Sequence, residues 1–251
     1  MEEELGSASV REQLITAGIE ELNAHGVAGF SLRRVAAACN ISCAAPYKHF
    51  KNKEELIGAI FSYIKRQLEQ HEGLNAYTNG AIRNAVKDIV GVQFRNMATL
   101  GGSIWGRFGF SDVLTVFLAM DCYVELYKSG IVPLEQFADM KKDNDILVRL
   151  IVKKTPGKVV YTAMRNQRTD FPVLTCALSN IGRETKAVIG ARPAKAMVIR
   201  DKNGLLPDGK AFAAFVAEQA PTDSNIRGSA AYRTHLIRVL VERAAKELGG
   251  M

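Results

Sequence analysis

The hydrophobic pattern of this 251-residue chain changes near residue 70, and that change constrains the fold more than any other feature. Before Gln70, apolar or small residues recur at spacings of three and four, as on one face of an amphipathic helix: Val10, Leu14, Ala17, Gly18 and Leu22. After Gln70, short alternating segments are separated by glycine and proline turns. We therefore expect an α+β chain with an all-α N-terminal module.

The first 70 residues predict four helices, at 9–25, 32–40, 42–47 and 53–70. Gly26 is expected to stop the first helix, because glycine adopts the left-handed conformation without steric cost. Ser31, Ser42 and Asn52 are expected to cap the next three helices through side-chain oxygens that accept from backbone amides. The expected core residues at the end of this module are Phe50, Leu56, Ile57, Ile60 and Phe61.

Charge is distributed unevenly along the chain, whose net charge is +7. Residues 1–70 carry eight basic and nine acidic residues, so the basic excess belongs to the remainder. The window 26–53 nevertheless contains no acid, and it holds Arg33, Arg34, Lys48, Lys51 and Lys53. A compact helical unit with a basic, aromatic-bearing second helix is how many proteins contact the DNA major groove.

These helices carry motifs of one regulator family. Ala36, Ile41–Ser42, Ala45–Phe50 and Asn52–Leu56 resemble the DNA-binding domain of the tetracycline-repressor (TetR) family over about residues 9–68. The resemblance implies base-edge contacts from Ser42, Cys43 and Ala44, and phosphate contacts from Ser31, Arg33, Tyr47, His49 and Lys53, with Lys48 in the same DNA-binding surface. Two alternatives stay open: His49 caps and packs against the next helix, and Arg33 with Arg34 forms an ordinary solvated helix face.

The remainder of the chain predicts a mixture of strands and helices. Strands are expected at 124–127, 146–152, 158–164, 174–179 and 194–199. Helices are expected at 81–90, 111–119, 210–218 and 230–248. This is an α+β arrangement and not the helical bundle that normally follows a TetR-type module.

Four segments of this remainder resemble a second family, the flavin-binding medium subunit of xanthine dehydrogenase and carbon monoxide dehydrogenase. They are 93–103, 111–112 with 118–121, 169–174 and 226–233. Together the two resemblances imply three domains: a TetR-like module at 1–70, a second FAD-binding subdomain at 71–145, and a CO-dehydrogenase-flavoprotein C-terminal-like domain at 146–251.

The second resemblance also implies a flavin site made of Thr99, Leu100, Gly101, Gly102, Ser103 and Asp112. Gly101 and Gly102 lack a Cβ, so their amides can approach a pyrophosphate, while Asp112 can accept from a ribityl or ribose hydroxyl. Paired glycines are also common in ordinary turns. FAD is the implied cofactor, although the first subdomain of the family is absent, which leaves half of the pyrophosphate cradle. Thr162 stands where a lysine is common, and Ser103 where asparagine is usual.

The cysteine pattern, the N-terminus and the charge distribution limit the class of protein further. Cys39, Cys43, Cys122 and Cys176 form no CxxC pair, so we expect reduced thiols and no metal site. The acidic N-terminus and the lack of a long apolar run predict a cytoplasmic protein with no membrane partner. Residues 141–202 hold fourteen basic and five acidic residues, which favours either an acidic partner or a solvated sheet surface.

Three functional hypotheses follow. The leading one is a TetR-like transcriptional regulator that binds double-stranded DNA as a homodimer and is fused to a flavoprotein-derived domain. The alternative is an FAD-binding electron-transfer subunit of a molybdenum hydroxylase, whose partners would be iron–sulfur and molybdenum subunits; any enzymatic role would then depend on them, and no catalytic residue is assigned. The third is a chimera of two partial modules, in which only the DNA-binding module is functional.

Overall fold

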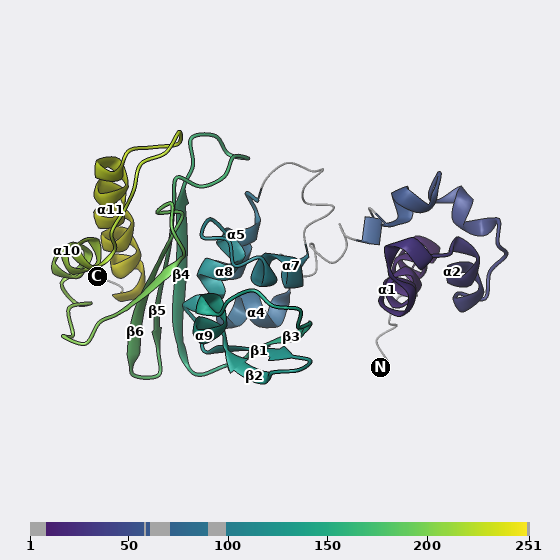
Figure 1. Cartoon of the computed structure of the whole chain (residues 1–251), viewed down its shortest axis with the longest axis horizontal. Coiled ribbons are helices and arrows are strands. Elements are labelled where there is room, and N and C mark those ends of the chain that lie inside the picture. Colours follow the sequence, from purple (N-terminus) through teal and green to yellow (C-terminus); the bar gives the residue numbers. More distant parts are fainter. Residues whose placement is uncertain (1–8, 58, 61–70, 90–98, 250–251) are drawn as a thin grey trace, which may run out of the picture. The chain divides into compact units, whose positions relative to one another are not determined.

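The computed structural model describes residues 9–57, 59–60, 71–89 and 99–249, which fall into two compact units (Figure 1). Unit 1 comprises the first two of these ranges and unit 2 the last two. The predicted mixture of helices and strands is confirmed, because the described part of unit 1 is helical and unit 2 combines two sheets with helices. None of the described helices is both long and apolar enough to cross a membrane.

Unit 1 is built from α1 (Val10–Gly29), α2 (Leu32–Ala38), the 3-10 turn η1 (Ala45–Lys48) and a helical segment at 53–57 and 59–60. Ser9 opens α1 with a capping box, in which its hydroxyl and the Glu12 carboxylate each bind the other's backbone amide. Gly26 leaves the helical conformation at φ +64° and places a kink in α1, which ends at Gly29. The core contains Leu14, Ile15, Phe30, Val35, Phe50, Leu56, Ile57 and Ile60, which confirms the predicted core residues except Phe61, which lies outside the described residues.

Two of the predicted helix caps in unit 1 are wrong. Ser31 makes no side-chain cap bond; instead its backbone amide donates to Glu21 Oε1 at 2.9 Å. The helix predicted to begin at Ser42 is a four-residue 3-10 turn that follows Ala44, with Pro46 in its first residues. A segment this short makes i→i+3 bonds in place of α-helical ones. The Asn52 cap is confirmed, since its Oδ1 accepts from the Glu55 amide at 2.8 Å.

Unit 2 contains two antiparallel sheets. The larger has the order β4 (Gly157–Met164), β5 (Leu174–Ile181), β6 (Glu184–Gly190), β7 (Met197–Arg200). The smaller has the order β2 (Gly130–Pro133), β1 (Cys122–Leu126), β3 (Leu147–Val152). In the larger sheet Val160, Cys176 and Ala187 belong to one hydrophobic cluster, whereas Tyr161, Ala177 and Val188 belong to another. This alternation means that both faces of the larger sheet are covered.

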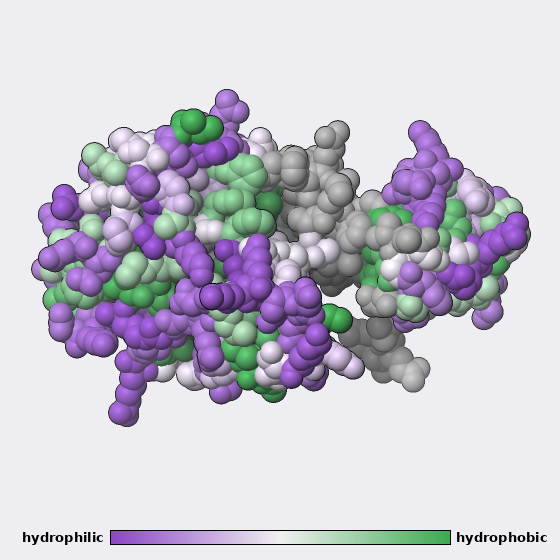
Figure 2. All heavy atoms as spheres, in the orientation of Figure 1, coloured by the Kyte–Doolittle hydropathy of each residue, from purple (hydrophilic) through white to green (hydrophobic). Residues whose placement is uncertain are grey.

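Helices cover the two faces of the larger sheet (Figure 1). One face packs on α10 (Gly209–Gln219) and α11 (Ala230–Gly249), and the other on α5 (Ala81–Val86) and α8 (Asp112–Leu118). The described part of the unit also contains three helices of six residues each: α4 (Glu72–Tyr77), α7 (Leu100–Trp105) and α9 (Leu134–Asp139). On the face shown in Figure 2, hydrophilic side chains dominate the surface of this unit.

The predicted elements of unit 2 are found with shifted ends, and some are missed. The strand predicted over 194–199 begins only at Met197, and the helix predicted over 81–90 ends at Val86, while residue 90 lies outside the described residues. The pattern missed β2 and β6, together with α4, α7 and α9. A six-residue helix has fewer than two turns, so its hydrophobic periodicity is too short to recognise. The strand β6 was missed because its first three residues include two charged ones.

Candidate functional site

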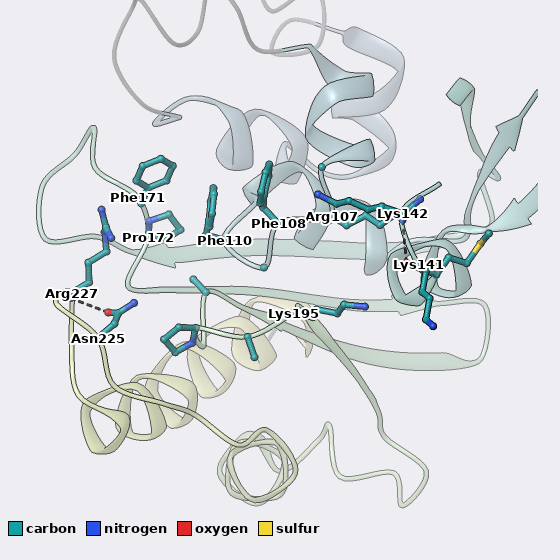
Figure 3. Close-up of a pocket in the computed structure, with 16 residues that line it drawn as sticks. Arg107, Phe108, Phe110, Lys141, Lys142, Phe171, Pro172, Lys195, Asn225 and Arg227 are labelled. Carbon is teal, nitrogen blue, oxygen red and sulfur yellow. Dashed lines mark hydrogen bonds between the residues drawn. The ribbon is translucent and has the colours of Figure 1, made fainter. Parts of the chain in front are cut away.

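A cleft in unit 2 encloses a cavity of about 680 Å³ (Figure 3). Five loops of the chain form its walls: the α7–α8 loop, the segment after α9, the β4–β5 loop, the β6–β7 loop and the segment before α11. Because loops from positions more than a hundred residues apart meet here, no local sequence motif marks the cleft. A concave site of this volume matches the usual size of a small-molecule pocket.

One side of the cleft is aromatic. Phe108 and Phe110 stack with ring centroids 5.2 Å apart, and Phe171 meets Phe110 edge-on at 4.8 Å. Phe108 and Phe110 are nonetheless 51% and 41% exposed. Large apolar rings that stay exposed inside a concavity offer a stacking surface to a planar ligand. Figure 3 shows these rings in a row beside Arg227.

The cleft is also basic. Its cations are Arg107, Lys141, Lys142, Lys195 and Arg227, and no described residue that lines it is a carboxylic acid. Lys195 lies 3.7 Å from the carboxylate of Asp139, outside the lining, while the Lys142 ammonium lies 5.1 Å from the Phe108 ring centre. The lining therefore attracts anions, and its stacked rings add a preference for aromatic ones.

Arg107 is the most buried of these cations, at 7% exposed. Its guanidinium lies over Phe137 at 3.9 Å and Trp105 at 5.1 Å, and Nη1 donates to the Met140 carbonyl at 3.1 Å. Nε and Nη2 find no hydrogen-bond partner among the described residues. Burial lowers the pKa of Arg107. The Asp143 carboxylate acts on Arg107 in the opposite direction, but it forms no direct ion pair with it among the described residues. A buried cation without such a pair is costly, so an anion bound nearby would be favoured.

The predicted flavin residues Thr99–Ser103 lie at the start of α7, and we call this segment the glycine turn. Thr99 caps this helix, because its Oγ1 accepts from the Gly102 amide at 2.8 Å. A Cβ on Gly101 would meet no heavy atom within 4 Å among the described residues, and the φ of Gly101 is not positive. Glycine in a helix costs about 0.5–1 kcal/mol relative to alanine, so the protein's own packing does not explain Gly101. The contact of these residues with a pyrophosphate stays a prediction.

The Asp112 carboxylate is buried and bonded within the protein, whereas a residue that only contacts a ligand would face the open site. Asp112 is 6% exposed, and its Oδ1 accepts from the Tyr161 hydroxyl and from Arg165 Nη2, the latter at 2.5 Å. Burial raises the pKa of Asp112, and the neighbouring Arg165 and Tyr161 act in the opposite direction. Burial also raises the pKa of Tyr161 well above its usual value. The contact of Asp112 with a flavin hydroxyl stays a prediction.

The predicted DNA-binding residues lie in unit 1, and most of them face solvent. The exposed ones are Arg33, Ser42, Cys43, Ala44, Tyr47, Lys48 and His49, whereas Ser31 and Lys53 are half-buried. Tyr47 is 58% exposed. Arg34 does not belong to a merely solvated face, because its Nη2 lies 2.5 Å from Oε1 of the buried Glu21.

Sequence analysis missed most residues of the cleft. Gly106 and Gly109 belong to the glycine turns expected after Gln70, and Phe108 and Phe110 beside them line the cavity. The aromatic side chains in a glycine-rich connection between two helices were the available signal. Gly109 also has a packing reason, since a Cβ there would lie 2.0 Å from the Ala194 carbonyl oxygen.

The layered sheets and helices of unit 2, with an aromatic and basic cleft, describe a mixed α/β domain that has a concave, anion-attracting site. Residues 9–154 match the family described as FAD binding domain in molybdopterin dehydrogenase. The match covers more than half of the chain, and the chain belongs to this family. The resemblance to flavin-binding medium subunits is thereby confirmed at the family level, and FAD is the cofactor that the family implies. The TetR resemblance stays a prediction.

Solved structures with a similar fold include quinoline 2-oxidoreductase from Pseudomonas putida 86, at a TM-score of 0.63 and 14% identity over 74% of this chain and 72% of that one. Carbon monoxide dehydrogenase from Oligotropha carboxidovorans gives a TM-score of 0.63 and 17% identity over the same shares. The uncharacterized protein YgfM of Escherichia coli K12 is 24% identical over 162 residues, 64% of this chain. The chain spans only 62% of the length of that relative.

Proposed function

We propose that this chain is an FAD-binding electron-transfer component of the molybdenum hydroxylase type. The family match supports this function. Within the chain, the main supporting observation is Gly101, whose lack of a side chain is not explained by packing against the described residues. The match therefore favours the sequence-based alternative over the leading regulator hypothesis. Bound FAD would supply two-electron chemistry that can also proceed in single-electron steps.

The residues at the start of α7 would hold the pyrophosphate. Thr99 keeps the turn closed through its bond to the Gly102 amide, which leaves the hydroxyl proton of Thr99 free for donation to an anion. Gly101 leaves room for the phosphate, and Ser103 can donate a second hydroxyl. Each of these residues could contact a phosphate oxygen, so the chain is expected to bind FAD through the pyrophosphate.

The cleft would hold the second reactant. Phe108 and Phe110 would stack on a planar ring and exclude water from it, while Lys141 and Lys142 would neutralise its anionic groups. A nicotinamide nucleotide or another anionic acceptor has this chemistry. Iron–sulfur and molybdenum subunits are the proposed electron donors, as in the assemblies of flavin medium subunits.

Titration of the purified chain with FAD, FMN and riboflavin tests this function. If the glycine turn holds a pyrophosphate, the protein should quench the fluorescence of added FAD in a saturable way. It should bind FMN more weakly and riboflavin not at all, because only FAD carries a pyrophosphate. Equal affinity for riboflavin and FAD would show that the turn does not hold phosphate. A colourless protein that takes up no FAD would refute the function.

DNA binding is the second candidate function. It is favoured by the exposure of Tyr47, Lys48 and His49 in a window of the sequence without acids. Gel-shift assays at increasing salt should show an affinity that falls steeply with ionic strength. Lys48→Ala should weaken binding, whereas Lys51→Ala, which changes another exposed lysine of the same window outside the predicted contacts, should have a smaller effect. No retardation at low salt would reject this function.

A further inference from the structure

Arg165 joins two parts of unit 2 that are far apart in sequence. It directly follows β4, and its side chain is 9% exposed. Nη2 donates to Asp112 Oδ1 at 2.5 Å, and Nη1 donates to the Asp170 carbonyl at 3.1 Å. A planar guanidinium fixes the directions of its donors, so it can hold two partners at once in one geometry.

On the Asp112 side, the bonds lead to the glycine turn. Asp112 is the first residue of α8, and Ser111 caps that helix by accepting from the Leu114 amide. The Ser111 hydroxyl also reaches the Ser103 carbonyl at 3.4 Å. The start of α8, which Arg165 holds through Asp112, is therefore bonded to the last residue of the predicted flavin segment.

On the Asp170 side, the bonds lead to the cleft. Asp170 Oδ1 accepts from the Phe171 amide at 2.7 Å and lies 3.4 Å from Arg227 Nη2. The Arg227 guanidinium in turn lies 5.2 Å from the centre of the Phe171 ring. Phe171 and Arg227 both line the cavity, whereas Arg165 does not. Asp170 thus fixes the aromatic and the cationic group at one end of the cleft (Figure 3).

We propose that Arg165 is a positioning residue that couples the glycine turn to the cleft, so that both keep their geometry through one side chain. The coupling itself stands on the bonds given above; the identity of the two ligands, flavin and anionic acceptor, rests on the proposed function. Arg165 would then set the relative placement of the two reactants without touching either.

Substitutions of Arg165 by lysine and by methionine distinguish its bond to Asp112 from its bond to the Asp170 carbonyl. Lysine keeps a positive charge beside the buried Asp112, but its single nitrogen cannot also reach the Asp170 carbonyl in the same geometry. Methionine combined with Asp112→Asn removes both bonds and the buried charge together, so the double variant avoids an unpaired buried carboxylate. Arg168→Met is a matched control on the same loop, since Arg168 is exposed and pairs with Asp88 at 3.1 Å.

Amide hydrogen exchange in the ligand-free chain is the test, with Gly102 and Phe171 as reporters because their amides donate to Thr99 Oγ1 and Asp170 Oδ1. Asp112→Asn/Arg165→Met should raise exchange at both amides about tenfold or more, Arg165→Lys at Phe171 only, and Arg168→Met at neither. In the folded double variant, exchange unchanged at either reporter would overturn the coupling.

The FAD dissociation constant provides a second readout. It should rise about tenfold in the double variant and stay within twofold in Arg168→Met. A wild-type chain that binds no FAD would refute the proposed function, but the exchange result would still decide the coupling, because that measurement needs no ligand.

Discussion

The Asp112 carboxylate and the Arg165 guanidinium form a 2.5 Å ion pair in which both side chains are less than a tenth exposed. The pair lies between α8 and the end of β4, and the Tyr161 hydroxyl donates to the same carboxylate oxygen. Burial raises the pKa of Asp112, and the cation beside it acts in the opposite direction, so Arg165 offsets part of the cost of burying the charged form.

Arg165→Met should therefore destabilise unit 2 in a pH-dependent way. Without the cation, the pKa of Asp112 rises further above its unfolded value. A carboxyl whose folded pKa is raised weakens the folded state as pH increases above the unfolded pKa of about 3.9. The loss in unfolding free energy should grow from a small value near pH 5 to about 3–5 kcal/mol near pH 8. Urea unfolding across this range measures it, and a loss independent of pH would contradict it.

Glu21 should stabilise unit 1 with the opposite pH dependence. The Arg34 guanidinium beside it holds the pKa of Glu21 below its usual value, against the effect of burial. Stability from this pair is present above the unfolded pKa of about 4.3 and is lost as pH falls through the lower folded pKa. Glu21→Gln should cost about 1–2 kcal/mol at neutral pH and remove this acid-dependent part. Thermal unfolding checks it, with exposed Glu20→Gln as the control; identical losses would reject this role.

Gly109 and Gly101 should respond to alanine in opposite ways. A Cβ at position 109 would lie 2.0 Å from the Ala194 carbonyl oxygen, so Gly109→Ala should destabilise unit 2 by about 1–3 kcal/mol. A Cβ at position 101 meets nothing among the described residues, so Gly101→Ala should leave stability unchanged or raise it by up to about 1 kcal/mol. Calorimetry of the two variants compares them, and similar melting shifts would contradict the placement of these glycines.

Phe110 should contribute to nucleotide affinity in the cleft. Replacing it with leucine keeps an apolar side chain but removes a ring that stacks on Phe108 and meets Phe171 edge-on. Loss of a stacked ring should weaken NADH binding about tenfold, in line with stacking energies of about 1–3 kcal/mol. Fluorescence titration measures the affinity, and Tyr127→Leu, at an exposed aromatic residue outside the lining, serves as the control. Equal affinities in both variants would exclude stacking on Phe110.

Sequence patterns predicted the parts of the fold that depend on local periodicity. The strand at 174–179 was found because its residues are small or apolar with no charge among them, as suits a strand buried on both faces, and it lies within β5. The Ser42 cap was wrong because the segment after it is a four-residue 3-10 turn that begins after Ala44, too far along the chain for the Ser42 side chain to cap. The bridge made by Arg165 could not be predicted, since its partners Asp112 and Asp170 depend on how α8 packs against the sheet. The glycine turn was predicted from a family resemblance, and the cleft was missed because its loops meet only in the folded unit.

Equilibrium binding of FAD to the wild-type chain and to Gly101→Val decides whether the residues at the start of α7 hold a flavin pyrophosphate. Valine adds a side chain where the turn leaves open space, so the fold should persist while the pyrophosphate is displaced. We expect saturable binding of one FAD per wild-type chain and at least about tenfold weaker binding by the variant, a difference of about 1.4 kcal/mol. Equal affinities, or no FAD binding by the wild-type chain, would contradict it.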